Sequence, residues 1–153
     1  MSRLWAAKVK AVQAALVAAI QAEYAANKAS YPAAMQAAFE CVQGIGAENL
    51  RAMPFVARVL GPGRSAFSGD ASGAYEGTMA LPVVVSAKGL TEDQWVEALS
   101  ELWGLVVDAL TTDPTLGGLV AGSADPAFEL DDPGEDGDVV AQTVTLRLIT
   151  RVQ

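Results

Sequence analysis

The residue types that most often carry enzyme chemistry are missing or unfavourably spaced in this chain. None of its 153 residues is histidine, so the commonest general base and metal ligand is missing. The single cysteine, Cys41, cannot form an internal disulfide, which is typical of a reducing compartment. Glu97 and Glu101 are one helical turn apart, the spacing of an exposed helix face. The sequence therefore predicts a protein that is not an enzyme and binds no cofactor.

Two glycine-rich stretches could be taken for phosphate-binding loops. GPGRS at 61–65 lacks the GxxxxGK[ST] pattern, and no helical pattern follows it. DPTLGGLVAG at 113–122 comes after a predicted helix and before a predicted strand, whereas a dinucleotide-binding loop follows a strand and opens a helix. We therefore interpret Gly117 and Gly118 as a bend, in which Leu116 and Leu119 anchor the turn in the core.

An acidic run, DDPGEDGD at 131–138, partly matches a calcium-binding loop. A calcium loop that begins at Asp132 would have Gly134 in its third position and Thr143 in its twelfth, where it needs an oxygen ligand and a bidentate glutamate. We interpret the run as a solvated hairpin turn, and we expect no metal site.

Charge is divided unevenly along the chain. Residues 1–88 hold eight Lys or Arg and five Asp or Glu, whereas residues 89–153 hold two and thirteen. Proteins that grip DNA neutralise its phosphates with basic side chains. The acidic half should therefore repel DNA, although ordinary solubility charge is an equally good explanation.

Hydrophobic periodicity predicts the helices. Apolar side chains at spacings of three and four predict a helix over 4–24, and the apolar run at 11–20 is shorter than the roughly 20 residues of a membrane span. A second short helix is expected over 33–43, with Met35, Phe39 and Val42 inward. Thr91 and Gln94 form a capping box that opens a third helix, which ends near Thr111.

Strands are predicted from alternation and from turn residues. We expect strands in FVARVLG from residue 55, over 78–88, in LVAG and AFEL, and over 139–150, with a flexible Gly/Ser/Ala-rich loop over 61–77. Pro82 suggests an edge strand or a bulge, because proline donates no ladder hydrogen bond.

These elements predict one α+β domain over 1–153. Its sheet is expected to be mostly antiparallel, with about four strands. A long N-terminal helix, a second short helix and a central helix should pack on one face.

Three segments resemble a known family. MALPVVVSAKG, LTTDPTLGGLVAG and the closing VVAQTVTLRLITRV, with a helix and an acidic turn between them, resemble the tail terminator proteins of long-tailed (siphovirus-like) bacteriophages. The likeness covers about residues 78–153 and, more loosely, the first helix, whereas residues 28–77 match no pattern of that family.

The resemblance implies a virion protein of the tail neck that assembles in the host cytoplasm. It implies a ring of identical subunits, a hexamer, which caps the head-proximal end of the tail tube, stops tube polymerisation and provides the head-tail joining surface. The implied partners are other copies of the chain, the major tail tube protein and a head-tail connector or neck protein. DNA would pass through without specific binding, and no membrane is involved.

Two surfaces follow as hypotheses. Strands 79–87 or the last strand could pair across subunits, because edge strands expose backbone donors and acceptors. The expected subunit or tail-tube contact comprises Met79, Leu81, Pro82, Val84, Leu116, Gly117 and Gly118. The expected DNA-repelling surface comprises Glu97, Glu101, Asp108, Asp131, Asp132, Glu135 and Asp136.

Two other classes remain open. One is another neck or tail-completion protein, and the other is a small non-enzymatic protein-binding module that uses an apolar edge. The module would be a monomer or dimer with one partner, whereas a ring protein would form a defined homo-oligomer.

Overall fold

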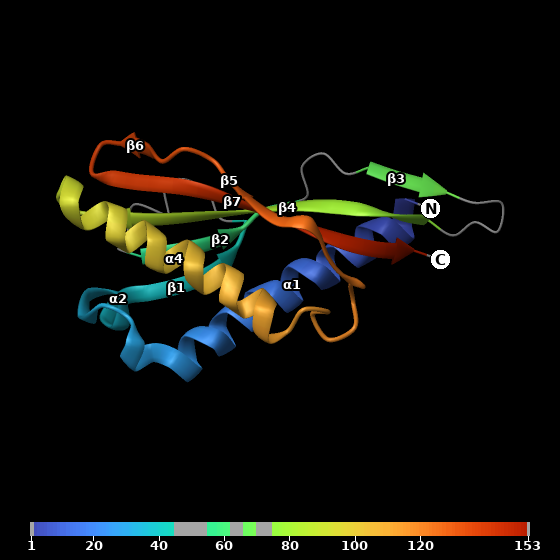
Figure 1. The fold of residues 1–153 in the computed structure, drawn as a ribbon, viewed down its shortest axis with the longest axis horizontal. Helices are drawn as coiled ribbons and strands as arrows, with labels where there is room; N and C mark the ends of the chain where they lie inside the picture. The colour runs from blue at the N-terminus through green and yellow to red at the C-terminus, as the bar shows by residue number, and fades with distance from the viewer. Residues whose placement is uncertain (1, 45–54, 62–65, 70–74, 153) are drawn as a thin grey trace.

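The computed structural model describes residues 2–44, 55–61, 66–69 and 75–152. Its elements are α1 (Ser2–Asn27), η1 (Lys28–Ser30), α2 (Ala33–Ala38), β1 (Phe39–Gln43), β2 (Phe55–Val59), β3 (Ala66–Gly69), β4 (Tyr75–Lys88), α4 (Glu92–Thr112), β5 (Gly122–Leu130), β6 (Gly134–Asp136) and β7 (Val139–Val152). Figure 1 shows the two long helices crossing the same side of one long, twisted sheet. The predicted α+β class and its long N-terminal and central helices are confirmed.

Within the described residues the sheet has seven strands rather than about four. Its main order is β1-β2-β4-β7-β5, with β3 paired to β4 and β6 paired to β7. Every pair is antiparallel except β1 with β2, which is parallel. The predicted mostly antiparallel pairing is therefore confirmed, whereas the predicted number of strands was too low.

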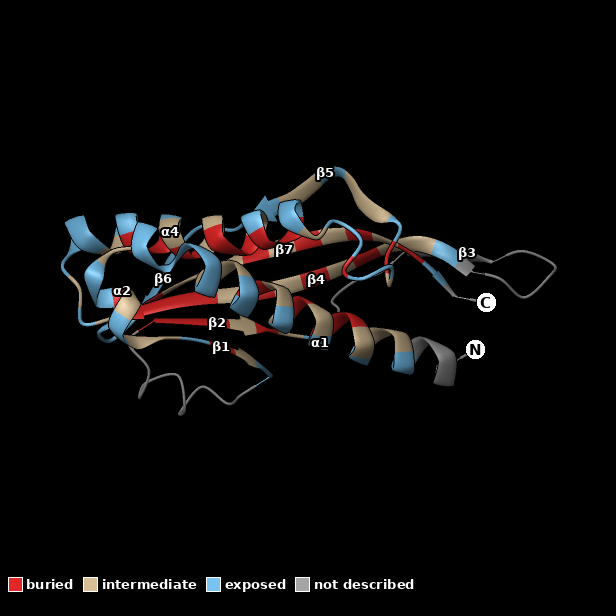
Figure 2. Cartoon of the chain, turned by 90° about the horizontal axis from the view of Figure 1, so that it is seen from below, coloured by how far each residue is buried: buried red, intermediate tan, exposed pale blue. Residues whose placement is uncertain are grey.

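The helices bury one face of the sheet (Figure 2). On α1, Val12, Leu16 and Ile20 are fully buried, as their spacing predicts. From α4 the core receives Leu99, Leu102, Leu105 and Val106, and from β4 and β7 it receives Met79, Leu81, Val83, Val144, Leu146 and Leu148. One apolar layer between two helices and the central strands forms the core.

The segment expected as one helix over 33–43 divides into two elements. Helix α2 ends at Ala38, and Phe39–Gln43 form strand β1, whose register places Cys41 beside Ala57 of β2. Strand alternation turns Cys41 into the core and leaves Val42 half-buried on the other face. The prediction was wrong there because pairing with β2, a tertiary contact, overrides a weak helical period.

The predicted loop over 61–77 was also wrong in part. Residues 66–69 form β3, which pairs with the start of β4 in the register Ala66 to Thr78. Residues 62–65 and 70–74 of the predicted loop lie outside the described residues. Of the expected strand LVAG, only Gly122 lies in a strand: it begins β5, which also contains all of AFEL.

The capping box and the last strand agree with the sequence. The Thr91 N–H donates to Gln94 Oε1 at 3.1 Å where α4 begins. In β7, Val140, Val144, Leu146 and Leu148 are buried on one face, as alternation predicts. The acidic run is a hairpin, in which β6 pairs with β7 across a turn containing Gly137 at φ 65°.

Pro82 lies inside the sheet rather than at an edge, because β4 pairs with both β2 and β7. Pro82 lies opposite Leu60, just beyond the last paired residue of β2. The Leu60 N–H donates to the Pro82 carbonyl at 3.0 Å. Proline has no N–H, so the Leu60 carbonyl receives no hydrogen bond from Pro82. Gln13 of α1 replaces that donor, since its Nε2 donates to the Leu60 carbonyl at 2.8 Å. Gln43 Nε2 in turn donates to Gln13 Oε1 at 3.0 Å.

Replacing Gln13 by leucine should therefore lower the free energy of unfolding by about 1–3 kcal/mol, because the Leu60 carbonyl loses its donor. Chemical unfolding followed by circular dichroism measures this cost. In a Pro82→Val background a main-chain N–H becomes available to Leu60, so the same Gln13→Leu change should cost less. Equal costs in both backgrounds would contradict this assignment.

Candidate interaction surface

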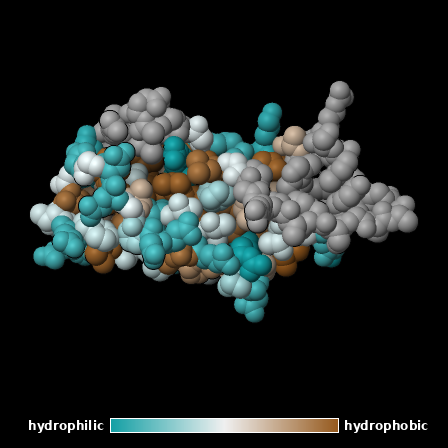
Figure 3. All heavy atoms as spheres, turned by 90° about the horizontal axis from the view of Figure 1, so that it is seen from above, coloured by the Kyte–Doolittle hydropathy of each residue, from teal (hydrophilic) through white to brown (hydrophobic). Residues whose placement is uncertain are grey.

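The face of the sheet away from the helices carries no covering helix among the described residues, although Val56 and Ser86 on this face are buried. Alternation places one cross-strand row on it, formed by Val42, Arg58, Val84 and Thr143 on β1, β2, β4 and β7. All four side chains are half-buried. Figure 3 views the molecule from this side and shows hydrophobic patches among polar atoms. A half-buried face of mixed character suits contact with another protein.

The predicted interface residues of β4 divide between the two faces. Met79 and Leu81 are 0% exposed and lie in the core beneath the helices. Pro82 and Val84 point to the helix-free face and are half-buried. The prediction that strand 79–87 is an exposed edge was wrong, because β2 and β7 pair with it on its two sides. The last strand is also interior, between β4 and β5.

The two outer strands of the main sheet path, β1 and β5, are protected against strand addition. At β1, Gln21 of α1 donates from Nε2 to the Cys41 carbonyl at 3.2 Å. At β5 the pairing with β7 shifts register between Ser123 and Phe128, and Pro126 within that irregularity carries no N–H. Irregular, proline-bearing edges discourage pairing with another chain. Strand addition at β1 and β5 is therefore disfavoured relative to contacts through side chains of the sheet face.

The loop after α4 is the bend that the glycine pair predicts. Three successive residues, Leu116, Gly117 and Gly118, have φ of 47°, 69° and 89°. The Gly117 N–H donates to Asp113 Oδ1 at 3.1 Å, which ties the bend to the end of α4. Leu116 is only 1% exposed, so its predicted place in a subunit contact is wrong and its place as a core anchor is confirmed. Gly117 and Gly118 are exposed at the tip of the loop.

The predicted acidic surface occupies two separate places. Glu97, Glu101 and Asp108 share one side of α4, which faces α1 and α2. Burial and the carboxylates of Asp108, Glu23 and Glu101 raise the pKa of Tyr31 to about 12, and Glu97 lines a cavity together with Ala34 and Met35 of α2. The second group, Asp131, Asp132, Glu135 and Asp136, is exposed on the β6 hairpin and the residues before it. Trp103 contacts Phe128 of β5, so this second group lies on the opposite side of α4.

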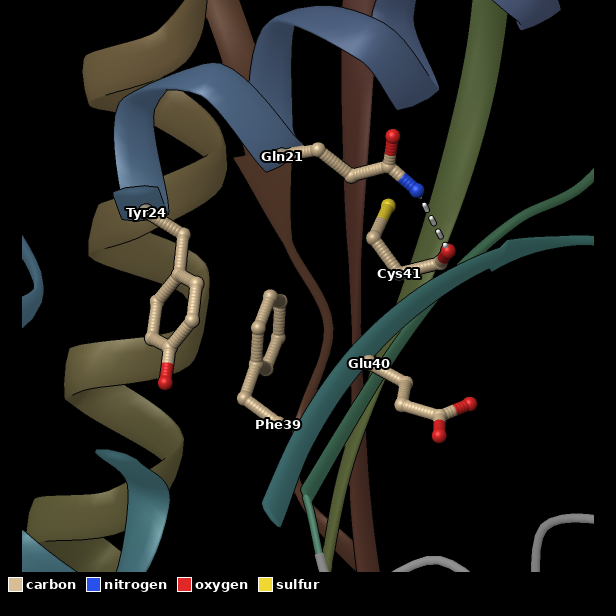
Figure 4. Close-up of a pocket in the computed structure, with 5 residues that line it drawn as sticks. All are labelled: Gln21, Tyr24, Phe39, Glu40 and Cys41. Carbon is tan, nitrogen blue, oxygen red and sulfur yellow. Dashed lines mark hydrogen bonds between the residues drawn. The ribbon is translucent and has the colours of Figure 1, made fainter. Parts of the chain in front are cut away.

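A cavity of about 250 Å³ lies between the end of α1 and β1 (Figure 4). Gln21, Tyr24, Phe39, Glu40 and Cys41 line it. Tyr24 and Phe39 face each other with ring centroids 4.6 Å apart, and the Tyr24 hydroxyl is within 3.1 Å of the carbonyls of Met35 and Gln36. Burial raises the pKa of the Cys41 thiol to about 12, so the thiol is protonated and a poor nucleophile at neutral pH. Sequence reasoning missed this cavity because β1 was expected to be helical.

A second cavity of about 210 Å³ lies between α2 and the start of α4. Its lining is mostly apolar, with Gln94 and Glu97 as the polar members: Pro32, Ala34, Met35, Phe55, Leu90, Gln94, Glu97 and Ala98. No group of three potential metal ligands occurs within the described residues. The described helices include none that is long and apolar enough to cross a membrane.

Together the fold and these surfaces define a small α+β protein whose helices cover one face of the sheet, while the opposite face carries no covering helix among the described residues. No protein-family model matches the chain. No curated protein matches it at a significant level either.

Proposed function

We propose that this chain is a tail terminator subunit of a long-tailed bacteriophage. In this role, copies form a ring on the head-proximal end of the tail tube, stop its growth and provide the surface that joins the head. The sequence segments at 79–89, 110–122 and 139–152 support the family assignment. The observation that carries the proposal structurally is the helix-free sheet face with its row of half-buried side chains.

A ring needs two unlike surfaces on each subunit, because each copy contacts its two neighbours through different patches. The helices cover only one face of this sheet, so its two sides present different chemistry. One side presents the acidic flank of α4, and the other presents valine, proline and threonine side chains on strands. Such a subunit suits a closed head-to-tail ring better than a two-fold dimer.

The first test measures the solution mass of the purified protein by light scattering over a wide concentration range, and then its binding to tail tubes. The expected result is a defined ring, or a monomer that becomes a ring only on tube ends. A concentration-independent monomer or dimer that ignores tubes would favour the protein-binding module. A ring that binds the neck and not the tube would indicate another tail-completion protein.

The acidic residues give a second test, because carboxylates that line a DNA channel would repel phosphates. They form two groups on opposite sides of α4, so we expect only one group to face the lumen. Reversal of Glu97, Glu101 and Asp108 to lysine, or of Asp131, Asp132, Glu135 and Asp136, should slow DNA ejection in one case only. Phage particles that carry each variant allow ejection and infectivity to be measured. Unchanged ejection in both would identify these charges as ordinary solubility charge.

A further inference from the structure

The cavity between α2 and the start of α4 has an apolar floor and opens at the protein surface. Its floor is formed by buried side chains, Met35, Phe55 and Ala98. Ala34 and Glu97, which also line it, are exposed, so the cavity opens to solvent between the two helices. An apolar cavity of roughly 150 Å³ can hold a benzene ring. The volume of about 210 Å³ is therefore enough for one leucine, methionine or phenylalanine side chain.

Carboxylates continue from the mouth of this cavity along the same side of α4. Glu97 lies at the mouth, Glu101 follows one helical turn later, and Asp108 lies two turns beyond Glu101. Thr112 Oγ1 donates to Glu23 Oε2 at 2.8 Å, so a fourth carboxylate, from α1, lies at the far end of this row. At 1.5 Å per residue, the row extends about 16 Å along the helix axis from position 97 to position 108. One side of α4 is therefore negative and begins at an apolar cavity.

The described part of the chain supplies no basic partner for this row. Glu97, Glu101 and Asp108 form no ion pair with a basic side chain among the described residues. After burial, the charges of Asp108, Glu23 and Glu101 contribute to the raised pKa of Tyr31, which is the effect of a negative potential on this side of α4. Carboxylates are costly to remove from water without a partner. Any protein segment that covers the row must therefore bring positive charge.

We propose that this acidic groove, the cavity together with Glu97, Glu101 and Asp108, binds a segment of a partner protein that carries one large apolar side chain and, next to it, lysine or arginine side chains. The apolar side chain would fill the cavity above Met35, and the basic side chains would pair with the carboxylates along α4. Acidic segments and DNA would be repelled, and a wholly apolar segment would leave the carboxylates without partners.

The acidic groove lies on the helix side of the sheet, so the helix-free face stays available for contact between subunits. The inference rests on the proposed function only for the source of the segment. That source would be the tail tube protein, because the proposed ring must hold to the end of the tube.

Methionine methyl signals test the cavity with defined peptides. The main probe is the capped peptide SLSKSKS, in which an extended chain places the leucine and both lysines on one side. In protein labelled with ¹³C at its methionine methyl groups, Met35 reports on the cavity and Met79 on the core. Titration to millimolar peptide should shift the Met35 signal saturably and leave the Met79 signal unchanged. Peptides with serine in place of leucine, or with glutamate in place of both lysines, should bind about tenfold more weakly or less.

Variants of the protein separate the two parts of the acidic groove. Ala34→Leu should fill the mouth of the cavity, and Glu97→Lys with Glu101→Lys should repel the lysines, so each should weaken peptide binding by about tenfold or more. The glutamate peptide should bind the second variant better than it binds the unchanged chain. Asp131→Lys with Asp132→Lys is the matched control, with the same charge change on the other side of α4, and it should bind normally. Circular dichroism checks that each variant is folded.

An unmoved Met35 signal, or equal binding of the lysine peptide to the unchanged chain and to Glu97→Lys with Glu101→Lys, would overturn the acidic groove. Tube capping gives the second readout. Normal capping by that folded double variant would remove the groove as the tube contact and keep the tail terminator function. Peptide binding by a chain that never engages tubes would keep the groove and remove the tail terminator function.

Discussion

Leu81→Ala is expected to lower the free energy of unfolding by about 2–5 kcal/mol, the usual cost of truncating a fully buried leucine. Leu81 is 0% exposed, pairs with Leu146 on β7 and lies beneath the helices. Truncation removes apolar contacts and leaves a cavity. Because β4 is hydrogen-bonded to a strand on each side, it cannot easily shift to fill that cavity. Equilibrium unfolding in urea, followed by circular dichroism, measures the loss.

Val84→Ser is the matched comparison, three residues along the same strand and on the opposite face. Its side chain is half-buried, so we expect a stability loss of about 1 kcal/mol or less. If the helix-free face contacts a neighbouring protein, this variant should fold and yet bind its partner or tail tubes less well. A severe loss of stability in Val84→Ser, with Leu81→Ala tolerated, would reverse our assignment of the two faces of β4.

Leu116→Ala should also lower the free energy of unfolding, by about 2–5 kcal/mol, because the anchor of the loop after α4 is lost from the core. The backbone at Leu116 has φ 47°, a conformation that costs an L-residue roughly 1–2 kcal/mol and that glycine adopts freely. Leu116→Gly should therefore be no less stable than Leu116→Ala, although glycine is ordinarily the more destabilising of the two. A clearly less stable glycine variant would show that this backbone conformation is not held in solution.

Gly117→Val tests the same bend without changing the core. A Cβ at Gly117 would meet no atom within 4 Å, so the cost is that of φ 69° alone. We expect about 1–2 kcal/mol or more, since a β-branched side chain tolerates this region poorly. Gly104→Ala is the control, because it lies within α4 with open space around its Cβ position and should be neutral or stabilising. A Gly117→Val protein of unchanged stability and assembly would contradict the interpretation of this loop.

Local sequence signals determined much of the fold. The spacing of Val12, Leu16 and Ile20 fixed the buried side of α1, and Thr91 with Gln94 marked the start of α4. Alternation identified the buried side of β7, and the two glycines at 117 and 118 identified the bend. These signals are local in the chain, because helix period, strand period and positive φ each depend on a few neighbouring residues.

Pairing between distant segments was decided only in the tertiary structure. Residues 39–43 became a strand because β2 was there to pair with them, and β3 formed by pairing with the start of β4. Pro82 suggested an edge, but Gln13 supplies the hydrogen bond that proline lacks and permits an interior position. The helices cover only one face of β4. For that reason Met79 and Leu81 are buried, whereas Pro82 and Val84 on the other face are half-buried. The acidic residues of the second half of the sequence form two separate surfaces, because one group lies on one side of α4 and the β6 hairpin lies on the other side.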